Sequence, residues 1–572
     1  MIFPPGYLRR RTSLLDELRM DGLPASTATK KSVLDGTEKH LTVVVQLNAQ
    51  RRAALADVDN APWSRFHLKI LVVTGIGFFT DSYDIFAINI AATMLGYVYG
   101  KDQVLNTNQD LGVKVATPVG TVFGQLLFGW LADVLGRKRM YGIELMIIIL
   151  GSFGQAVAGE AHTVDILAVV ILWRFVMGVG IGGDYPLSTV IPSEFASTRH
   201  RGMLITAVGA AQGWGAFTGA LVALIITTAY KDSLLRDDPT NLVLIDTMWR
   251  LLIGFGCVPG AIALYFRLTI PETPRFTMDI ERNVRQASDD VDSFLKHGTF
   301  VVDPDAVVQR VAAPRATRRD FRRYFGQWKN LKVLIGTCWS WFAIDIAFYG
   351  LGLNTAIILD AIGFGSPSSS VTGTLAVYQN LRNICIGNLI LTVAGQIPGA
   401  YLCVFTIDRI GRKPIQAGGF AVLAALFVTM GFAYERLNAS HTGARVFVLL
   451  YCLCNFFSNF GPNSTVGVTP GEAFPTRYRA TAHGISAASG KLGAVVAQVG
   501  FARLKDIGGP NQFVKHILEI FAFFMLSGVA STMLIPETKG ISLEDLSRED
   551  QEEFIEGMAQ ETPHAADAVT AS

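Results

Sequence analysis

Charge is scarce in this chain of 572 residues, since 17% of them are charged and the formal net charge is +2. Soluble domains carry about 25% charged residues, and so balanced a net charge gives no bulk basicity that would favour nucleic acid as a partner. Cysteine is also rare. The six cysteines are scattered through apolar stretches, and the nine histidines form no HExxH pattern. Nothing resembles a disulfide framework or a zinc site, and we expect no cofactor and no metal.

Hydrophobic residues make up 50% of the chain. They come in blocks of about 20, the length that spans a bilayer. We therefore predict an all-α membrane protein with 12 transmembrane helices. The predicted spans are 68–98, 112–133, 140–159, 165–188, 203–229, 247–269, 331–354, 380–405, 413–433, 444–466, 481–503 and 513–535.

The loops predict the orientation. Basic loops alternate with less basic ones, and the positive-inside rule places the basic loops and both termini in the cytoplasm. No signal peptide opens the chain, so the first helix is expected to act as the targeting signal. The predicted parts are a cytoplasmic N-terminal tail, an N-terminal six-helix half, a cytoplasmic linker loop, a C-terminal six-helix half and a cytoplasmic C-terminal tail, at 1–66, 67–270, 271–330, 331–540 and 541–572.

Three local patterns lie outside the spans. The basic stretch RATRRDFRRYF (Arg315–Phe325) is typical of a solvated or membrane-surface helix. Asn438 begins a glycosylation sequon in a predicted external loop. The kinase-like pattern RRRTS (Arg9–Ser13) allows regulatory kinases to act on the cytoplasmic tails.

The two predicted halves repeat each other. Three motif pairs occur in the same order at an offset near 270 residues, which indicates a 6+6 duplication around a central substrate site. The pairs are Gly124–Lys138 with Gly395–Lys413, Ser193–Gly202 with Gly471–Ala480, and PETPR (Pro271–Arg275) with PETKG (Pro536–Gly540).

Two glycine-rich stretches imitate nucleotide sites. Gly178–Gly183 matches GxGxxG but follows no strand, and Gly484–Lys491 has five residues between its glycines where a P-loop needs four. No ATP site is indicated, so transport by this chain should be secondary.

Charged residues inside predicted spans are the informative ones, because each costs about 2.5–3.5 kcal/mol at a bilayer centre. They are Asp81, Asp84, Glu144, Asp184, Asp345 and Lys491. A structural ion pair with Lys491 would explain one acid, but five carboxylates exceed that need. Intramembrane acids are expected in proton relays. Asp81 and Asp84 are three residues apart, which places them on one helix face.

Neutral polar residues accompany these acids. Trp341, Asp345 and Tyr349 are spaced four apart, so they lie along one face of the seventh span. Gln212 and Asn463 add amides in other spans, where helix–helix hydrogen bonds remain an alternative role. Donors and an acid together suit a protonated oxyanion such as phosphate, whose P–OH groups an acid can recognise.

Family motifs support this interpretation. The D-x-x-GRK copies, R-x-x-x-G-x-G at Arg174–Gly180 and the PET motifs resemble the major facilitator superfamily, over about residues 66–545. GGDYPLS (Gly182–Ser188), FFTDSYD, WFAIDIAFYG, FGPN and SAASGKLGA closely resemble its phosphate:proton symporter family, which includes the fungal high-affinity phosphate transporters.

That resemblance implies roles for particular residues. Those implied to contact phosphate are Tyr185, Gln212, Trp341, Asp345, Tyr349 and Asn463. Those implied to couple protons are Asp81, Asp84, Glu144, Asp184 and Lys491. We further expect Lys491 to pair with Asp81 or Asp84 when they are ionised.

We therefore expect a symporter that imports inorganic phosphate with protons across the plasma membrane by alternating access, and not an enzyme. Two alternatives remain open. One is a proton-coupled porter of another anion, such as a glycerophosphodiester or sulfate. The other is a phosphate-sensing receptor that signals without net transport.

Overall fold

The computed structural model describes most of the predicted helical core. The described residues are 55, 58–236, 241–268, 272–273, 275–276, 317–361 and 373–547. The kinase-like pattern, most of the predicted linker and the end of the predicted C-terminal tail lie outside these residues. The boundaries of the tails and of the linker therefore stay predictions.

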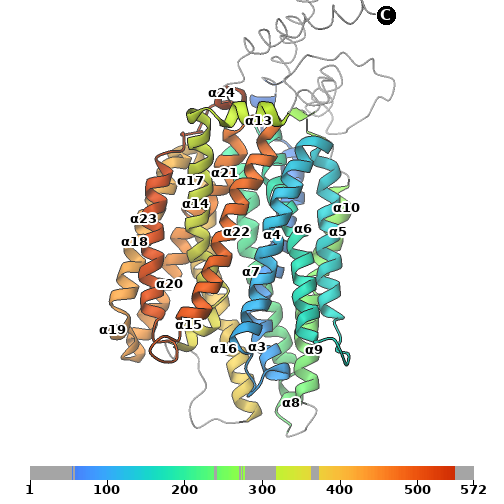
Figure 1. Ribbon diagram of the computed structural model, residues 1–572, viewed down its shortest axis with the longest axis vertical. Helices are drawn as coiled ribbons and strands as arrows, with labels where there is room; N and C mark the ends of the chain where they lie inside the picture. Colours follow the sequence, from blue (N-terminus) through green and yellow to red (C-terminus); the bar gives the residue numbers. More distant parts are fainter. Residues whose placement is uncertain are drawn as a thin grey trace, which may run out of the picture. The chain divides into compact units, whose positions relative to one another are not determined.

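The first six predicted spans are helices (Figure 1). Most of their ends lie close to the prediction, but α6 extends to Phe195, beyond the predicted end at 188, and α9 begins at Asn241, before the predicted start at 247. Helix α4 packs against α6, and α3 packs against α7. The bounds are α3 (Arg65–Tyr99), α4 (Thr107–Leu135), α5 (Arg137–Ala156), α6 (Ile166–Phe195), α7 (Arg201–Ala229), the short α8 (Lys231–Leu234), α9 (Asn241–Gly254) and α10 (Cys257–Arg267).

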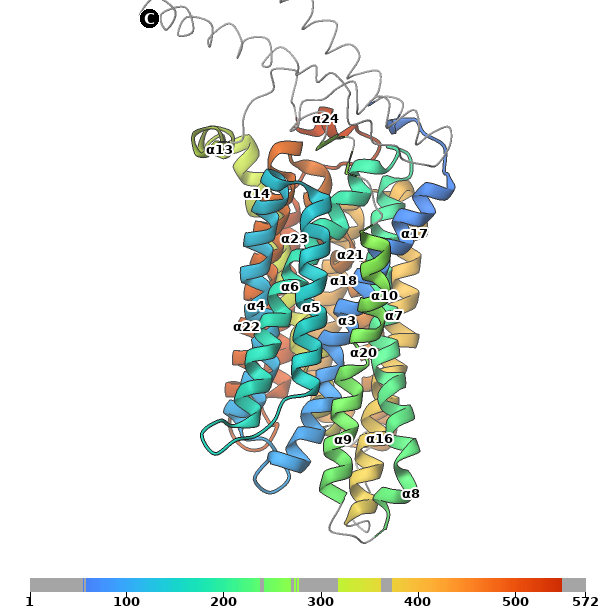
Figure 2. The ribbon, with the colours of Figure 1, turned by 90° about the vertical axis from the view of Figure 1, so that its right-hand side faces the viewer.

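The last six predicted spans are helical as well. Helix α22 packs against α4, and α16 and α17 pack against α7, so the two halves meet along these pairs (Figure 2). The bounds are α13 (Arg318–Phe325), α14 (Trp328–Gly352), α15 (Thr355–Ala361), α16 (Thr374–Leu391), the π-helix η1 (Thr392–Gln396), α17 (Ile397–Ile410), α18 (Arg412–Phe432), α19 (Tyr434–Asn438), α20 (His441–Asn459), α21 (Pro462–Ala473), the 3₁₀-helix η2 (Thr476–Tyr478), α22 (Arg479–Leu504), α23 (Val514–Thr532) and α24 (Leu543–Ser547).

Eleven helices of the described residues are long and apolar enough to cross a membrane. The predicted span that is missing from this set is α5. It has the length, but its arginine-rich start and the buried Glu144 lower its apolar character. It packs against α6 and α10 inside the bundle, in the place of a twelfth span.

Two predicted spans are broken helices. The sixth divides at Phe255–Gly256 into α9 and α10, and the tenth divides at Phe460–Gly461 into α20 and α21. Proline at position 462 begins α21, because proline lacks the N–H that a helix interior requires. Transporters commonly place broken helices at their substrate sites.

The PET motifs make the same contact in both halves of the repeat. Glu272 accepts a hydrogen bond from the Lys138 backbone N–H at 3.1 Å, and Glu537 accepts one from the Lys413 N–H at 3.0 Å. Each carboxylate thus caps the start of a helix, where its charge is favoured. Gly136, at the first cap, has φ = 103°, which favours glycine.

The two ends of the bundle are named here by the short helices they carry. The α24 end carries α13 and α24, and the α19 end carries α8 and α19 (Figure 1). The predicted surface helix is α13, which buries Phe325 against Phe474 and Tyr478 at the α24 end. Asn438, of the sequon, is exposed at the opposite end.

Candidate substrate cavity and charged clusters

A small cavity of about 50 Å³ lies between the two halves. All six residues that the sequence predicts to bind substrate line it, together with Lys491. They come from α6, α7, α14 and α21, so both halves contribute. The predicted residues in this lining are Tyr185, Gln212, Trp341, Asp345, Tyr349 and Asn463.

Asp345 and Lys491 form a buried ion pair beside this cavity. The Lys491 ammonium donates to Asp345 Oδ2 at 2.8 Å, and each side chain is 2% exposed. The same ammonium lies 4.3 Å from the Tyr349 ring centroid and 4.8 Å from that of Tyr185, so two aromatic faces add to its stabilisation. Lys491 is therefore bound to Asp345 here, and the expected pairing with Asp81 or Asp84 is not the one observed.

Hydrogen bonds connect the neutral groups of the cavity. Gln212 Nε2 donates to the Tyr185 hydroxyl at 3.1 Å, and the Tyr185 and Tyr349 hydroxyls lie 3.5 Å apart. Asn463 Nδ2 donates to Asn459 at 2.9 Å. These contacts hold hydroxyl and amide groups of both halves around one space, where they can turn toward a ligand.

Glycine makes the approach of α22 to α14 feasible. A Cβ atom at Gly490 would overlap the Trp341 ring and would lie 2.9 Å from Asp345 Oδ2. The glycine that imitates a P-loop in the sequence therefore serves packing, and it lets Lys491 reach Asp345.

A second charged cluster lies within the N-terminal half. Arg267 donates to Glu144 Oε1 at 2.7 Å and to Asp184 Oδ2 at 2.8 Å, and all three side chains are fully buried. Ser188 also donates to Asp184, at 2.5 Å. Asp81 lies beside Asp184. Neither Asp81 oxygen accepts a hydrogen bond from a described residue, so three carboxylates share one guanidinium.

Asp84 belongs to a different environment, although it shares a helix with Asp81. Ser152 donates to its Oδ2 at 2.9 Å, and the charge of Arg174 acts on it. The spacing of three residues predicted one face for both acids, but their surroundings differ because the neighbouring helix α6 presents different residues at the two levels. It places Asp184 beside Asp81 and Arg174 near Asp84.

Arg267 is the functional candidate that sequence reasoning missed. It ends the sixth span, where a basic residue reads as a membrane-flanking charge. The signal that could have found it is charge balance, since an N-terminal half with several buried acids needs a buried cation.

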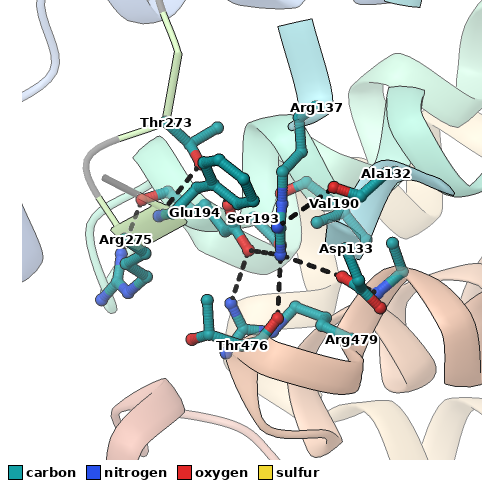
Figure 3. Close-up of polar contacts among 12 residues, drawn as sticks. Ala132, Asp133, Arg137, Val190, Ser193, Glu194, Thr273, Arg275, Thr476 and Arg479 are labelled. Atoms are coloured by element: carbon teal, nitrogen blue, oxygen red, sulfur yellow. Dashed lines mark hydrogen bonds and ion pairs between the residues drawn. The ribbon is translucent and has the colours of Figure 1, made fainter. Parts of the chain in front are cut away.

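Buried ion pairs close the α24 end across the halves (Figure 3). Glu194 accepts from Arg479 Nη1 at 2.9 Å and from Arg137 Nη2 at 3.2 Å (Figure 3). Arg137 also donates to the Thr476 carbonyl at 2.8 Å. Arg479 and Thr476 belong to the C-terminal half, so the Glu194–Arg479 ion pair and the Arg137–Thr476 hydrogen bond exist only while the halves meet at this end.

The sequence repeat places a second set of these bonds in the C-terminal half. Glu472 accepts from Arg412 Nη2 at 2.8 Å and from Arg201 Nε at 2.9 Å. Here Arg201 is the residue that comes from the other half. Glu194 and Glu472, the paired glutamates of the repeat, therefore have equivalent roles. Each accepts from one arginine of its own half and from one arginine of the other half.

Arg275 joins three separate segments at the same end. It donates to the Glu194 carbonyl at 2.6 Å, to Asp59 Oδ1 at 2.8 Å and to Glu544 Oε1 at 2.9 Å. The Arg275 guanidinium holds the pKa of Glu544 at about 2, well below its usual range. Helix α24 is thereby attached to the N-terminal half.

The α19 end has a larger cavity, of about 400 Å³, between the halves, and we call it the vestibule. The buried Lys114 at its wall donates to Asp110 at 2.8 Å and to Asn354 at 3.2 Å. Asn354 donates to Gln498 at 3.1 Å, and Gln498 donates to the Tyr349 carbonyl at 2.7 Å. A polar chain thus runs from the vestibule to the central cavity.

The fold and the site together define a membrane transporter of the major facilitator type. Residues 70–549 match the sugar (and other) transporter family, and the chain belongs to that family. It is a multi-pass membrane transporter and not an enzyme.

Relatives within this family narrow the comparison. The chain is 47% identical to the repressible high-affinity phosphate permease of Neurospora crassa, over 92% of this chain and 94% of that protein. It is 46% identical to the inorganic phosphate transporter PHO84 of Saccharomyces cerevisiae, over 87% of each. The proton:xylose symporter XylE matches with a TM-score of 0.62 at 20% identity, over 85% of this chain and 99% of that one, which shows the fold alone.

Proposed function

We propose that this protein is a secondary symporter that carries inorganic phosphate together with protons. The observation that carries the proposal is the central cavity, which is lined by all six residues that the family resemblance implies to contact phosphate. One of the six, Asp345, forms an ion pair with Lys491 there. High identity to two phosphate carriers over nearly the whole chain supports the same substrate.

The cavity groups suit a partly protonated tetrahedral anion. Lys491 offers the positive charge, and the hydroxyls of Tyr185 and Tyr349 and the amides of Gln212 and Asn463 offer donors. Asp345 can accept a hydrogen bond from a P–OH group, or donate one when it is protonated. Sulfate has no such hydrogen near neutral pH, so Asp345 would face acceptors only.

Protons are carried by the cluster around Arg267. Three buried carboxylates against one guanidinium leave excess negative charge, and burial makes that charge costly. Protonation of Asp81, which accepts no hydrogen bond from a described residue, relieves part of this cost. Glu144 and Asp184 keep their contacts with Arg267, while Asp84 forms a separate site near Arg174.

Transport follows from rocking of the halves 67–270 and 331–540 about the central cavity. The α24 end faces the cytoplasm, and the α19 end faces the outside of a plasma membrane. Phosphate enters through the vestibule while the ion pairs of Glu194 and Glu472 hold the α24 end closed. Release of those pairs opens the central cavity to the cytoplasm.

The test is phosphate uptake by the purified protein in liposomes, with and without an inward proton gradient. We expect accumulation that a protonophore abolishes and that arsenate, but not sulfate, inhibits. Asp345→Asn should lose accumulation even when equal amounts of folded protein are compared, and its melting temperature should fall because the buried Lys491 ammonium loses its partner. Normal uptake by this variant would show that phosphate transport does not require the Asp345 carboxylate.

Two other results would replace the proposal. Binding of phosphate without uptake under either condition would identify a phosphate receptor. Uptake of sulfate or of a glycerophosphodiester in preference to phosphate would identify a porter of another anion.

A further inference from the structure

A third cavity, of about 40 Å³, lies between the vestibule and the central cavity, and we call it the chamber. Its position follows from α14 and α15. Tyr349 of α14 lines the central cavity, Gly352 at the end of α14 lines the chamber, and Asp360 of α15 lines the vestibule. The chamber is nearly as large as the central cavity. By volume it holds roughly three water molecules.

Aromatic rings separate the chamber from the central cavity. Phe86 of α3 lies edge-on to Phe348, with ring centroids 5.8 Å apart. It also stacks on Tyr349, with centroids 6.1 Å apart and an angle of 13°. Phe86 belongs to the N-terminal half and the other two rings to the C-terminal half, so this wall opens when the halves move apart.

Two amides separate the chamber from the vestibule. Asn89 of α3, which lines the vestibule, donates from Nδ2 to Asn388 Oδ1 at 3.3 Å. Asn388 of α16 lines the chamber. This hydrogen bond again joins the two halves, so the chamber has a separate closure on each side.

Part of the chamber wall is polar, and none of the described residues that line it is charged. Its polar groups are Thr355, Asn388, Thr392, Gln396, Tyr451 and Asn455. Gln396 is the informative member, because it is 6% exposed and its Nε2 has no hydrogen-bond partner among the described residues. A buried amide without a partner costs free energy unless a ligand or water satisfies it.

Gln396 also ends the π-helix η1, which interrupts the α16–α17 span. Single π-turns inside α-helices are rare and are frequent at functional sites. The backbone irregularity and the unpartnered amide are independent observations, and both fall on the chamber wall.

We propose that the chamber is an outer binding site for phosphate, occupied on the way from the vestibule to the central cavity. This inference rests on the proposed function. Uncharged amides and hydroxyls can donate to a phosphate monoanion and accept from its P–OH groups. Because the site has no counter-cation among its described residues, it binds phosphate weakly. Transport requires weak binding at an intermediate site, since the ion must be able to leave it again. The Lys491 charge then draws phosphate inward.

The test uses Gln396→Leu in the full-length protein, with phosphate as the ligand. Uptake should show KM raised by about tenfold, the order expected for one lost hydrogen bond to a charged group. Equilibrium binding of phosphate to the central cavity should remain that of wild type. Gln396→Glu keeps the shape and adds negative charge, so its uptake should be lower still near neutral pH and should recover as the medium is acidified.

The matched control is Gln416→Leu, which removes a buried glutamine whose partner is Thr532, away from the three cavities. Asn455→Leu tests a second polar residue of the chamber, on α20, if Gln396→Leu does not fold. Kinetics of both chamber variants equal to those of the control would overturn the inference while the proposed function stands. Inhibition of uptake by a hexose, relieved in Gln396→Leu, would assign the chamber to a polyol instead. A wild type that neither binds nor transports phosphate would refute both proposals.

Discussion

Glu194 controls how tightly the two halves are held together at the α24 end, and Glu194→Gln tests this directly. Its side chain is fully buried and serves Arg479 of one half and Arg137 of the other. Removal of one partner of a buried ion pair costs about 3–5 kcal/mol. Because two arginines share Glu194, we assign half of that cost, ~1.5–2.5 kcal/mol, to the Glu194–Arg479 pair, which joins the two halves.

This cost applies only to the state that is closed at the α24 end, so it shifts the population toward the open state. At 1.4 kcal/mol per factor of ten, the open state should gain roughly 10- to 60-fold. The assay is alkylation of a cysteine introduced by Thr476→Cys, a position that is 2% exposed here. In the Glu194→Gln background this cysteine should react faster by that same factor.

Two companion variants make the result specific. Glu472→Gln removes the equivalent carboxylate of the repeat and, like Glu194→Gln, should raise the alkylation rate. Glu435→Gln removes an exposed carboxylate at the α19 end, where ion pairs are worth little, and should leave the rate within about twofold. An unchanged rate in Glu194→Gln, in a protein that still melts cooperatively, would refute the gating role of this network.

Three further outcomes are expected. Gly490→Ala should weaken phosphate binding by at least tenfold with a small loss of thermal stability, because the added Cβ would displace Trp341. Isothermal titration measures the affinity, and an unchanged value would contradict this prediction. Arg267→Gln should destabilise the fold by about 3–5 kcal/mol and change the pH dependence of uptake, because Glu144 and Asp184 lose their buried partner. Equal melting temperatures of wild type and variant would argue against this. Glu544 has its pKa lowered to about 2, so the stability it contributes is present above about pH 4.5 and is lost as pH falls toward 2. The melting difference between wild type and Glu544→Gln should therefore shrink over that range, and a constant difference would exclude the Arg275 contact as its source.

The sequence predicted the helices well, because long apolar blocks leave few other structures in a membrane. It also predicted which side chains line the central cavity, since the family motifs carry those residues. It did not predict the breaks at Gly256 and Gly461 or the π-turn before Ile397, because hydropathy does not register a local change in backbone hydrogen bonding.

The sequence also did not predict which charged side chains pair with each other. Lys491 could reach several acids by helix spacing alone, and its bond to Asp345 depends on how closely α22 approaches α14 at Gly490. Arg267 was missed for a similar reason, because its carboxylate partners lie on two other helices that only the packed structure brings to it.

The contacts of Arg275 also bear on how the chain assembles during synthesis. Asp59 is already made when Arg275 leaves the ribosome, but Glu544 follows about 270 residues later. At about 5–20 residues per second, that interval is roughly 15–50 s. During it the N-terminal half carries an arginine cluster at its α24 end without the carboxylate from α24, so a chaperone or acidic lipid headgroups have time to occupy that position before the last helix arrives.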